Sequence, residues 1–395
     1  MSKVVIIGAG ASGIIAALKA SEKNEVILLE SSDKCGKKIL LTGNGKCNYW
    51  NNNIKINKYQ TDDINKLEDI LKNKDDVLNY LYNLGIYPKI KNGLYYPYSN
   101  QASSIEQIFL DELNKRNITI KTNYKVKEII KKEKFIIKSD IEEITSDKLI
   151  IATGSKALNK TDDTMFNILK KLNHKINPIL PSLVPLKTNK EDWNGVRCDA
   201  SVNLYINDKF IKQESGEIQL TDYGVSGICI FNISSIVSKN LYLKNKVNLK
   251  INFLPTINNI YQFIDERNKL LNNYNIEELL ESLLPYKLLF VILKQSKIKK
   301  EEYWNNLNIE QKNNLCKNIE SFELKVTDTL SYDRAQVCTG GISLKEVDIN
   351  MESKKLKDLY IIGEILDVDG ICGGYNLAFA FITGYIVGSD ICDKS

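Results

Sequence analysis

Histidine is almost absent from this sequence, because His174 is the only one among 395 residues. A catalytic triad, a histidine-ligated metal or a histidine proton shuttle would each depend on that single side chain. His174 lies in the polar stretch "KKLNHKINP", for which we predict a solvated surface position at a helix end. The eight cysteines form no C-x-x-C pair and no zinc-ligand spacing, so we expect free thiols in a reducing cytoplasm and no metal site. Redox chemistry would therefore have to come from a bound cofactor.

Long apolar runs and a strong charge of one sign are also missing. The stretch "LAFAFITGYIVG" falls well short of the ~20 residues that span a bilayer. The start, "MSKVVIIGAG", leaves no room for a signal peptide. The formal charge of +5 permits contact with a polyanion without requiring it. We therefore expect a cytoplasmic protein that does not insert into membranes.

What the sequence does contain is a strand–helix–strand unit at its start. The apolar runs "KVVIIGAG" and "EVILLE" are typical of buried parallel strands, and "ASGIIAALKASEK" between them has helical spacing. Gly8 allows a tight turn, Gly10 lets the backbone approach a pyrophosphate, and Gly13 lets the helix pack on the strand. Glu30 ends the second strand, where it can bind ribose hydroxyls. The alternative is a turn that needs glycine only for its shape. We assign dinucleotide binding to Gly8, Gly10, Ala11, Ser12, Gly13 and Glu30.

The predicted secondary structure changes three times along the rest of the chain. Residues 62–83 have helical spacing, "NGLYYPYSNQASS" is interpreted as an aromatic loop, and "KFIIKSDIEEITSDKLIIATG" as a hairpin leading into a buried strand. Short strands and turns then dominate to about residue 256, followed by charged helices to 320. After residue 340 the α/β character returns. We predict an α/β Rossmann-like nucleotide-binding domain over 1–190 and 340–395, an inserted β domain over 191–257 and 321–339, and a helical subdomain over 258–320.

The returning C-terminal segment favours FAD over NAD as the tightly held cofactor. The "IIATG" strand would pass beside the cofactor, and the late "IIGE" strand would bring an acid to its ribityl and pyrophosphate region. The last helix would aim its N-terminus at the flavin ring and stabilise negative charge there. Only one G-x-G-x-x-G is present, so NAD(P)H would bind transiently elsewhere as electron donor. These segments assign cofactor binding to Ala152, Thr153, Gly154, Gly363, Glu364, Gly373, Gly374, Tyr375, Asn376 and Leu377.

The stretch "LLTGNGKCN" does not fit a phosphate loop of the Walker type. A Walker loop needs glycine where this chain has Leu40, and Ser or Thr where it has Cys47. We expect it instead to wrap the flavin half of FAD, with Lys37 and Lys38 near the pyrophosphate and Gly43 to Gly45 under the ring. The expected cofactor-binding residues here are Lys38, Gly43, Asn44, Gly45, Lys46 and Asn48.

Several motifs together carry a family resemblance. "GAGASG", "GKKILLTGNGKCN", "YPYSNQASS", "TDYGVSG", "CTGGISLKEVD", "MESK" and "LYIIGEILDVDGICGGYNLAFAFITGY" closely resemble, in order, the BaiN/RdsA family of NAD(P)/FAD-dependent oxidoreductases. The resemblance implies a discontinuous FAD domain with an inserted β-barrel-like domain and a helical subdomain. One departure is Ile228, where many relatives have a proline after the "GxSG" turn.

The resemblance implies one of two chemistries: reduction of a uridine to dihydrouridine in 23S ribosomal RNA, which we favour, or a redox step on a small conjugated enone such as a bile-acid-type steroid. In both, a C=C bond conjugated to a carbonyl accepts hydride from flavin N5, and an acid protonates the neighbouring carbon. Without a nearby histidine, the available acid is a thiol or a tyrosine. Cys47 and Cys372 are the candidate thiols and Cys338 is third, although each could be a small buried residue. A flavin-binding interaction module without turnover is a further alternative.

Two features could serve RNA binding. Tyr95, Tyr96 and Tyr98 could stack on a flipped-out base, although we favour packing. The lysines of "KQSKIKKEE" could contact RNA phosphates, but a solvated helix face is the commoner explanation.

Overall fold

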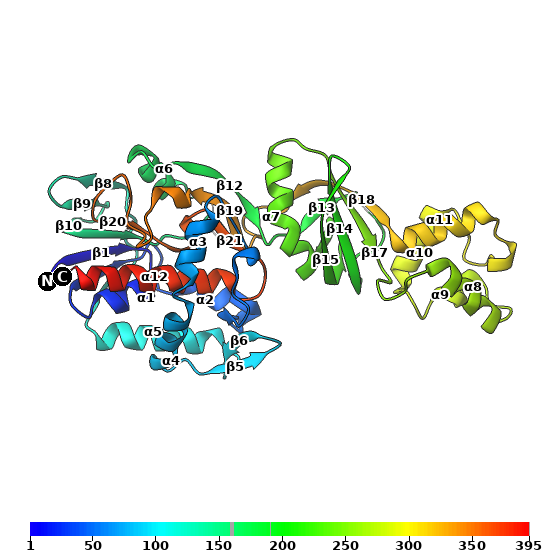
Figure 1. The fold of residues 1–395 in the computed structure, drawn as a ribbon, viewed down its shortest axis with the longest axis horizontal. Helices are drawn as coiled ribbons and strands as arrows, with labels where there is room; N and C mark the ends of the chain where they lie inside the picture. Colours follow the sequence, from blue (N-terminus) through cyan, green and yellow to red (C-terminus); the bar gives the residue numbers. More distant parts are fainter. Residues whose placement is uncertain (159–161, 190, 395) are drawn as a thin grey trace. The chain divides into compact units, whose positions relative to one another are not determined.

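The architecture comes from a computed structural model that describes residues 1–158, 162–189 and 191–394. The chain divides into two units, Met1–Leu180 with Gln336–Ser395, and Pro181–Ala335 (Figure 1). Each unit has its own hydrophobic core. We call them the nucleotide unit and the inserted unit. The barrel strands and the helices of the inserted unit share one core, and the finer division into a β domain and a helical subdomain stays a prediction.

A five-stranded parallel sheet forms the centre of the nucleotide unit. Its order is β20-β11-β1-β2-β7, made of Leu359–Ile361, Lys148–Ile151, Lys3–Ile7, Glu25–Leu29 and Thr119–Lys121. All its pairings are parallel, and the inner strands are apolar runs because both of their faces are covered. Numbered along the chain, this is the Rossmann order 3-2-1-4-5. The order reverses between β1 and β11, so a binding crevice is expected at the carboxyl ends of these two strands.

Helices α1 (Ala11–Ala20) and α12 (Tyr375–Asp393) pack against one another beside this sheet (Figure 1). Two glycines of α12 make the close contact possible. A Cβ atom at Gly384 would lie 2.4 Å from the Ser12 carbonyl oxygen, and one at Gly388 would lie 2.5 Å from Cβ of Lys19. The first and last helices of the chain are therefore held at backbone contact distance.

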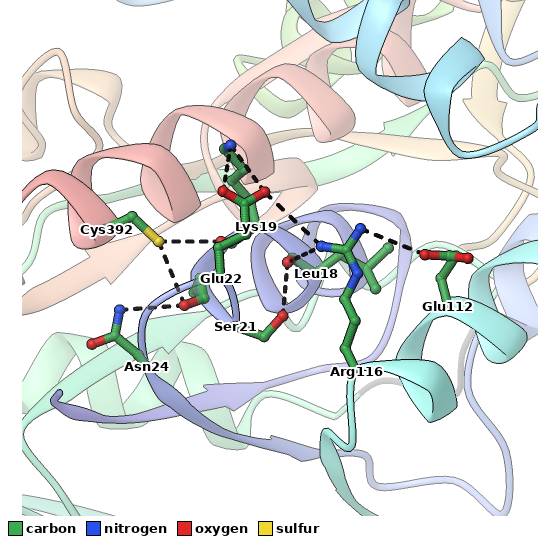
Figure 2. Close-up of polar contacts among 9 residues, drawn as sticks. Leu18, Lys19, Ser21, Glu22, Asn24, Glu112, Arg116 and Cys392 are labelled. Atoms are coloured by element: carbon green, nitrogen blue, oxygen red, sulfur yellow. Dashed lines mark hydrogen bonds and ion pairs between the residues drawn. The ribbon is translucent and has the colours of Figure 1, made fainter.

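The C-terminal end of α1 accepts hydrogen bonds from two side chains, one just after α5 and one in α12 (Figure 2). Arg116, which follows α5 (Ala102–Lys115), donates from Nη1 to the Leu18 carbonyl at 2.7 Å. The Cys392 thiol of α12 donates to the carbonyls of Lys19 at 3.2 Å and Ala20 at 3.5 Å. These bonds satisfy carbonyls that a helix end leaves without intrahelical partners. They fix α1 at the end away from its glycine-rich N-terminus.

Smaller elements surround this frame. The segment predicted as an aromatic loop is in fact a β-hairpin followed by a helix. Strands β5 (Pro88–Lys91) and β6 (Leu94–Pro97) are joined by Asn92 and Gly93, both with positive φ, and β3 (Trp50–Asn51) pairs with β6. An Asn-Gly pair between strands is a strong hairpin signal, so this turn was readable from the sequence. The other elements of this unit are α2 (Lys37–Leu41), β4 (Tyr59–Thr61), α3 (Ile64–Leu71), α4 (Lys74–Asn83), β8 (Glu128–Lys131), β9 (Phe135–Lys138), β10 (Glu143–Ser146), α6 (Thr164–Lys171), β19 (Val337–Ile342) and β21 (Val368–Gly370).

The inserted unit contains a closed six-stranded barrel, which confirms the expected barrel. Its strand order is β13-β16-β15-β14-β17-β18, made of Leu186–Thr188, Gly224–Gly227, Lys209–Leu220, Arg197–Ile206, Val247–Asn252 and Phe322–Thr329. The predicted helices are also present, as α8 (Ile260–Leu270), α9 (Ile276–Leu280), α10 (Tyr286–Ser296) and α11 (Ile309–Glu320). Strand β12 (Ile176–Ser182), of which residues 176–180 belong to the nucleotide unit, pairs with β19 of that same unit.

One helix of the inserted unit was missed. Helix α7 (Ile228–Tyr242) lies inside the segment predicted to be strands and turns. Ile228 is its first residue, a position at which proline is also well accommodated. The departure from the family pattern at this residue is thus compatible with the same helix start.

The prediction of a surface histidine was wrong. His174 is 4% exposed, with Nε2 2.7 Å from Ser353 Oγ and Nδ1 3.3 Å from the Leu169 carbonyl oxygen. Burial lowers the pKa of its imidazole, because the charged form is disfavoured away from water. His174 is a packed residue, buried against a segment 179 positions later in the chain.

Across the described parts of the chain, no helix is long and apolar enough to cross a membrane. The eight cysteines all lie within those parts, and none of them forms a disulfide there.

Candidate active site

The glycine motif forms the turn between β1 and α1, and its three glycines have different surroundings. A Cβ atom at Gly8, where φ is +105°, would lie 2.4 Å from the Ala152 carbonyl oxygen. One at Gly13 would lie 1.9 Å from the Gly8 carbonyl oxygen. A Cβ at Gly10 would meet no atom within 4 Å. Gly8 and Gly13 thus serve packing at the reversal point of the sheet, whereas Gly10 borders open space at the N-terminus of α1.

Glu30 holds this turn from the end of β2. Its Oε2 accepts a hydrogen bond from the Ala9 amide at 2.9 Å, and its Oε1 accepts one from the Ser32 amide at 2.8 Å. The half-buried carboxylate is thereby oriented beside the glycine turn. This is the position from which an acid binds the ribose of a dinucleotide.

Glu364 joins three distant segments next to the same turn. Its carboxylate pairs with the Lys38 ammonium and accepts a hydrogen bond from Ser155 Oγ. A Cβ at the preceding Gly363 would lie 2.4 Å from Ser12 Oγ, so Glu364 adjoins the first turn of α1. Gly154, three residues after β11, has φ +73° and faces open space. The segments predicted to bind FAD from residues 38, 152–154 and 363–364 therefore meet here.

The second group of predicted residues lies at the N-terminus of α12. Gly374, with φ +86°, caps the helix, and a Cβ there would lie 2.6 Å from the Trp50 carbonyl oxygen. Asn51 donates from Nδ2 to the Gly373 carbonyl at 2.9 Å. Asn376 exchanges hydrogen bonds with the backbone of Gly370, at 2.8 and 2.9 Å. Strand β3 thus fixes the helix end, and the half-buried Leu377 lies in its first turn.

Tyr375 is buried in that first turn, and its carbonyl accepts a hydrogen bond from the Tyr59 hydroxyl at 3.0 Å. Asn51 and Tyr59 were not identified from the sequence, and neither was Ser155, because their roles arise from contacts 209 to 322 positions apart along the chain.

The loop over residues 42–48 follows α2, and its middle part is exposed. Gly43, Asn44 and Gly45 have positive φ and are exposed, as is Lys46. A Cβ at Gly45 would meet no atom within 4 Å, which leaves space beside the loop.

The two residues after Lys46 turn inward. Asn48, with its amide nitrogen toward them, donates to the carbonyls of Tyr95 at 3.2 Å and Trp50 at 3.1 Å. Cys47 is fully buried, and burial raises the pKa of its thiol to about 11. The loop is therefore fastened to β3 and β6 beside the N-terminus of α12.

The three candidate thiols differ in environment. Cys47 is inaccessible in this conformation, whereas Cys372 is partly exposed and directly precedes the Gly373–Gly374 cap. Burial, with the Glu364 carboxylate nearby, raises the pKa of the Cys338 thiol to about 11. All three belong to the nucleotide unit.

A cavity of about 430 Å³ opens beside the exposed loop. It is lined by Lys46, Lys89, Lys91, Tyr96 and Asn100, which come from the loop, the β5–β6 hairpin and the turn after it. Among the described residues, none of the three lysines has an acidic partner. Tyr95, by contrast, packs edge-on against the buried Tyr49, with ring centroids 6.3 Å apart.

These residues fit FAD. Gly10, Gly45 and Gly154 leave space that a side chain would fill, Glu30 is positioned for a ribose, and two helix N-termini supply amide groups and positive potential for phosphate and reduced flavin.

Comparison with known proteins agrees with this geometry. The family model described as "HI0933-like protein Rossmann domain" matches residues 2–390. The chain belongs to the HI0933-like family. It is 33% identical to the 3-dehydro-bile acid delta(4,6)-reductase of Clostridium scindens, with both chains covered completely. It is 26% identical to the ribosomal RNA dihydrouridine synthase of Escherichia coli, covering 98% of this chain and 97% of that protein.

The similarity to solved structures supports the fold alone. The 3-ketosteroid-delta4-(5alpha)-dehydrogenase of Rhodococcus jostii superposes with a TM-score of 0.51 at 13% identity, covering 99% of this chain and 96% of that one.

Members of the HI0933-like family are FAD-dependent oxidoreductases, so this chain is an FAD-binding enzyme and the BaiN/RdsA resemblance is confirmed. The alternative of an interaction module without turnover is thereby excluded.

Proposed function

We propose that this enzyme reduces an activated C=C bond, and that its substrate is a uridine of 23S ribosomal RNA, which becomes dihydrouridine. The observation that carries the substrate proposal is the exposed loop over residues 43–46, which opens onto a cavity lined by three lysines. An RNA substrate requires an open, positively charged rim, whereas a steroid requires a closed apolar pocket. The similarity to the ribosomal RNA dihydrouridine synthase of E. coli supports the same substrate.

When bound, FAD supplies the hydride that adds to the carbon farther from the carbonyl, and NAD(P)H is the proposed source of electrons. The protein must deliver a proton to the carbon beside the carbonyl. We assign this proton to Cys372, because it is partly exposed at the N-terminus of α12, with Cys47 as the second candidate. The high pKa of Cys47 keeps its thiol protonated at neutral pH, but its burial would require the loop to move before it could reach a substrate.

Mass-spectrometric mapping of dihydrouridine in 23S ribosomal RNA tests the substrate. A site that vanishes on deletion of the gene and returns with the wild-type gene supports the proposal. The same mapping with Cys372→Ala and with Cys47→Ala distinguishes the roles of the two thiols, because dihydrouridine formation should require only the thiol that donates the proton. If every dihydrouridine persists after deletion, the RNA substrate is refuted.

A small enone is the second candidate, favoured by the 33% identity to the bile acid reductase over the full length of both chains. Reduced enzyme should then be reoxidised without oxygen by a steroid dienone and not by uridine-containing RNA. The opposite preference would exclude this candidate.

A further inference from the structure

We propose that the face of the β5–β6 hairpin that carries Lys89 and Lys91 is the docking surface for single-stranded RNA, with its lysines binding phosphates and the exposed Tyr87–Tyr98 pair stacking on bases. The inference rests on the proposed RNA substrate and adds the binding surface on this chain.

The lysines and aromatic rings share one face of the hairpin. The register pairs Lys89 with Tyr96, and the Tyr98 amide donates to the Tyr87 carbonyl at 2.9 Å, which continues the same ladder. Side chains alternate between faces along a strand, so positions 87, 89 and 91 of one strand lie on the same face as 96 and 98 of the other. Lys89 and Lys91 are therefore about 7 Å apart along the strand.

The charge of this face is uncompensated. Lys46, Lys89 and Lys91 converge on the cavity, and among the described residues none of them has a carboxylate partner. Elsewhere in this unit some exposed lysines do form ion pairs, such as Lys121 with Glu142 and Lys134 with Asp147. A polyanion is the complementary ligand for such a cluster.

The aromatic pair adds a feature that a small anion would not need. Tyr87 and Tyr98 are 71% and 66% exposed, and their ring centroids are 5.9 Å apart. Exposed rings beside a positively charged groove are the pattern that binds single-stranded nucleic acid, because bases stack on the rings while cations follow the backbone.

The hairpin is also connected to the flavin site. Strand β6 pairs with β3, and the Trp50 carbonyl of β3 lies against the Gly374 cap of α12. Lys46 of the cavity belongs to the exposed loop itself. RNA held on this face would thus have a nucleotide near the N-terminus of α12.

The test is equilibrium binding of the FAD-loaded protein to a fluorescein-labelled oligouridine, measured by anisotropy at several salt concentrations. The double variant Lys89→Gln/Lys91→Gln removes two phosphate contacts, so the slope of log K against log salt should decrease in magnitude by about 1.4. Affinity at 0.1 M salt should then decrease about 25-fold. The matched control is Lys132→Gln/Lys170→Gln, which removes two exposed lysines without ion pairs among the described residues of the same unit and should leave both quantities unchanged.

The aromatic pair is tested separately. Tyr87→Ala/Tyr98→Ala should weaken binding at least about 5-fold with an unchanged salt slope, and Tyr87→Phe/Tyr98→Phe should retain affinity because the rings remain. Flavin absorbance per protein, equal in all variants, verifies that the fold and cofactor are intact.

Equal affinity and slope for the Lys89/Lys91 variant and its control would overturn the proposal. So would a loss confined to binding of inorganic pyrophosphate, which would identify a small-anion site. Because binding is measured without turnover, lysine-dependent RNA binding in a protein that forms no dihydrouridine would refute the proposed reaction and leave the docking surface standing.

Discussion

Gly10 and Gly13 provide a test that separates cofactor binding from packing within one turn. A Cβ at Gly10 would meet no protein atom within 4 Å, whereas one at Gly13 would lie 1.9 Å from the Gly8 carbonyl oxygen. Gly10→Ala should therefore leave the apoprotein within about 1 kcal/mol of wild-type stability, since Gly10 is only a helix N-cap. The new methyl group would occupy the space where the backbone approaches the pyrophosphate.

The expected magnitudes follow from these distances. Overpacking against the pyrophosphate costs about 1–3 kcal/mol, which weakens FAD binding about 5- to 150-fold in Gly10→Ala. In Gly13→Ala the same cost of about 1–3 kcal/mol lowers the free energy of unfolding, because the methyl group must displace backbone atoms. For a unit of about 240 residues this lowers the melting temperature by roughly 2–12 °C.

The assay combines flavin titration with thermal unfolding of apoprotein followed by circular dichroism. Wild-type FAD affinity in Gly10→Ala would refute the assignment of that space to the cofactor. Equal melting temperatures for Gly13→Ala and wild-type apoprotein would refute the packing role of Gly13.

Three further outcomes are expected. Gly384→Ala should destabilise the protein by about 1–3 kcal/mol in urea unfolding, because its Cβ would lie 2.4 Å from the Ser12 carbonyl, although alanine is the better helix former by about 1 kcal/mol. Burial lowers the pKa of His174 in the folded protein below the value of about 6.5 that the imidazole has in the unfolded chain, so between these two pKa values the unfolded chain binds more protons. The free energy of unfolding should therefore decrease as the pH falls from about 6.5 through the folded-state pKa. The variant His174→Gln should lose this pH dependence, which denaturant titrations at each pH would measure. Cys372→Ala should retain FAD but slow substrate-dependent reoxidation of the reduced enzyme about 10²- to 10⁴-fold, and an unchanged rate would remove Cys372 as proton donor.

Local patterns were sufficient for the parts of the site that depend on short segments. The turn at Gly8–Gly13, the strand directly before Glu30 and the glycine-capped last helix each follow from a few adjacent residues, and all are present. The β5–β6 hairpin was also readable, since Asn92 and Gly93 stand between its strands, but the aromatic composition of the segment obscured that signal.

Other features depend on contacts that no local pattern encodes. His174 lies in a polar stretch, yet Ser353 and the segment around it bury the ring. Helix α7 was missed because the strands around it, which later close the barrel, dominate the character of the segment. The roles of Ser155 and Asn51 likewise exist only once distant segments have come together.

The same long-range contacts determine when the site can exist. Glu364 meets Lys38 from 326 positions away, and the Gly373 carbonyl meets Asn51 from 322 positions away. The glycine turn at residues 8–13 is formed by residues near the start of the chain. The segments that lie opposite this turn, around Glu364 and the N-terminus of α12, come from the end of the chain. The fold therefore requires both ends of the nucleotide unit before it can surround FAD. A cofactor that binds only the native state stabilises that state by mass action, so FAD should also stabilise the protein against opening of the junction between these two ends.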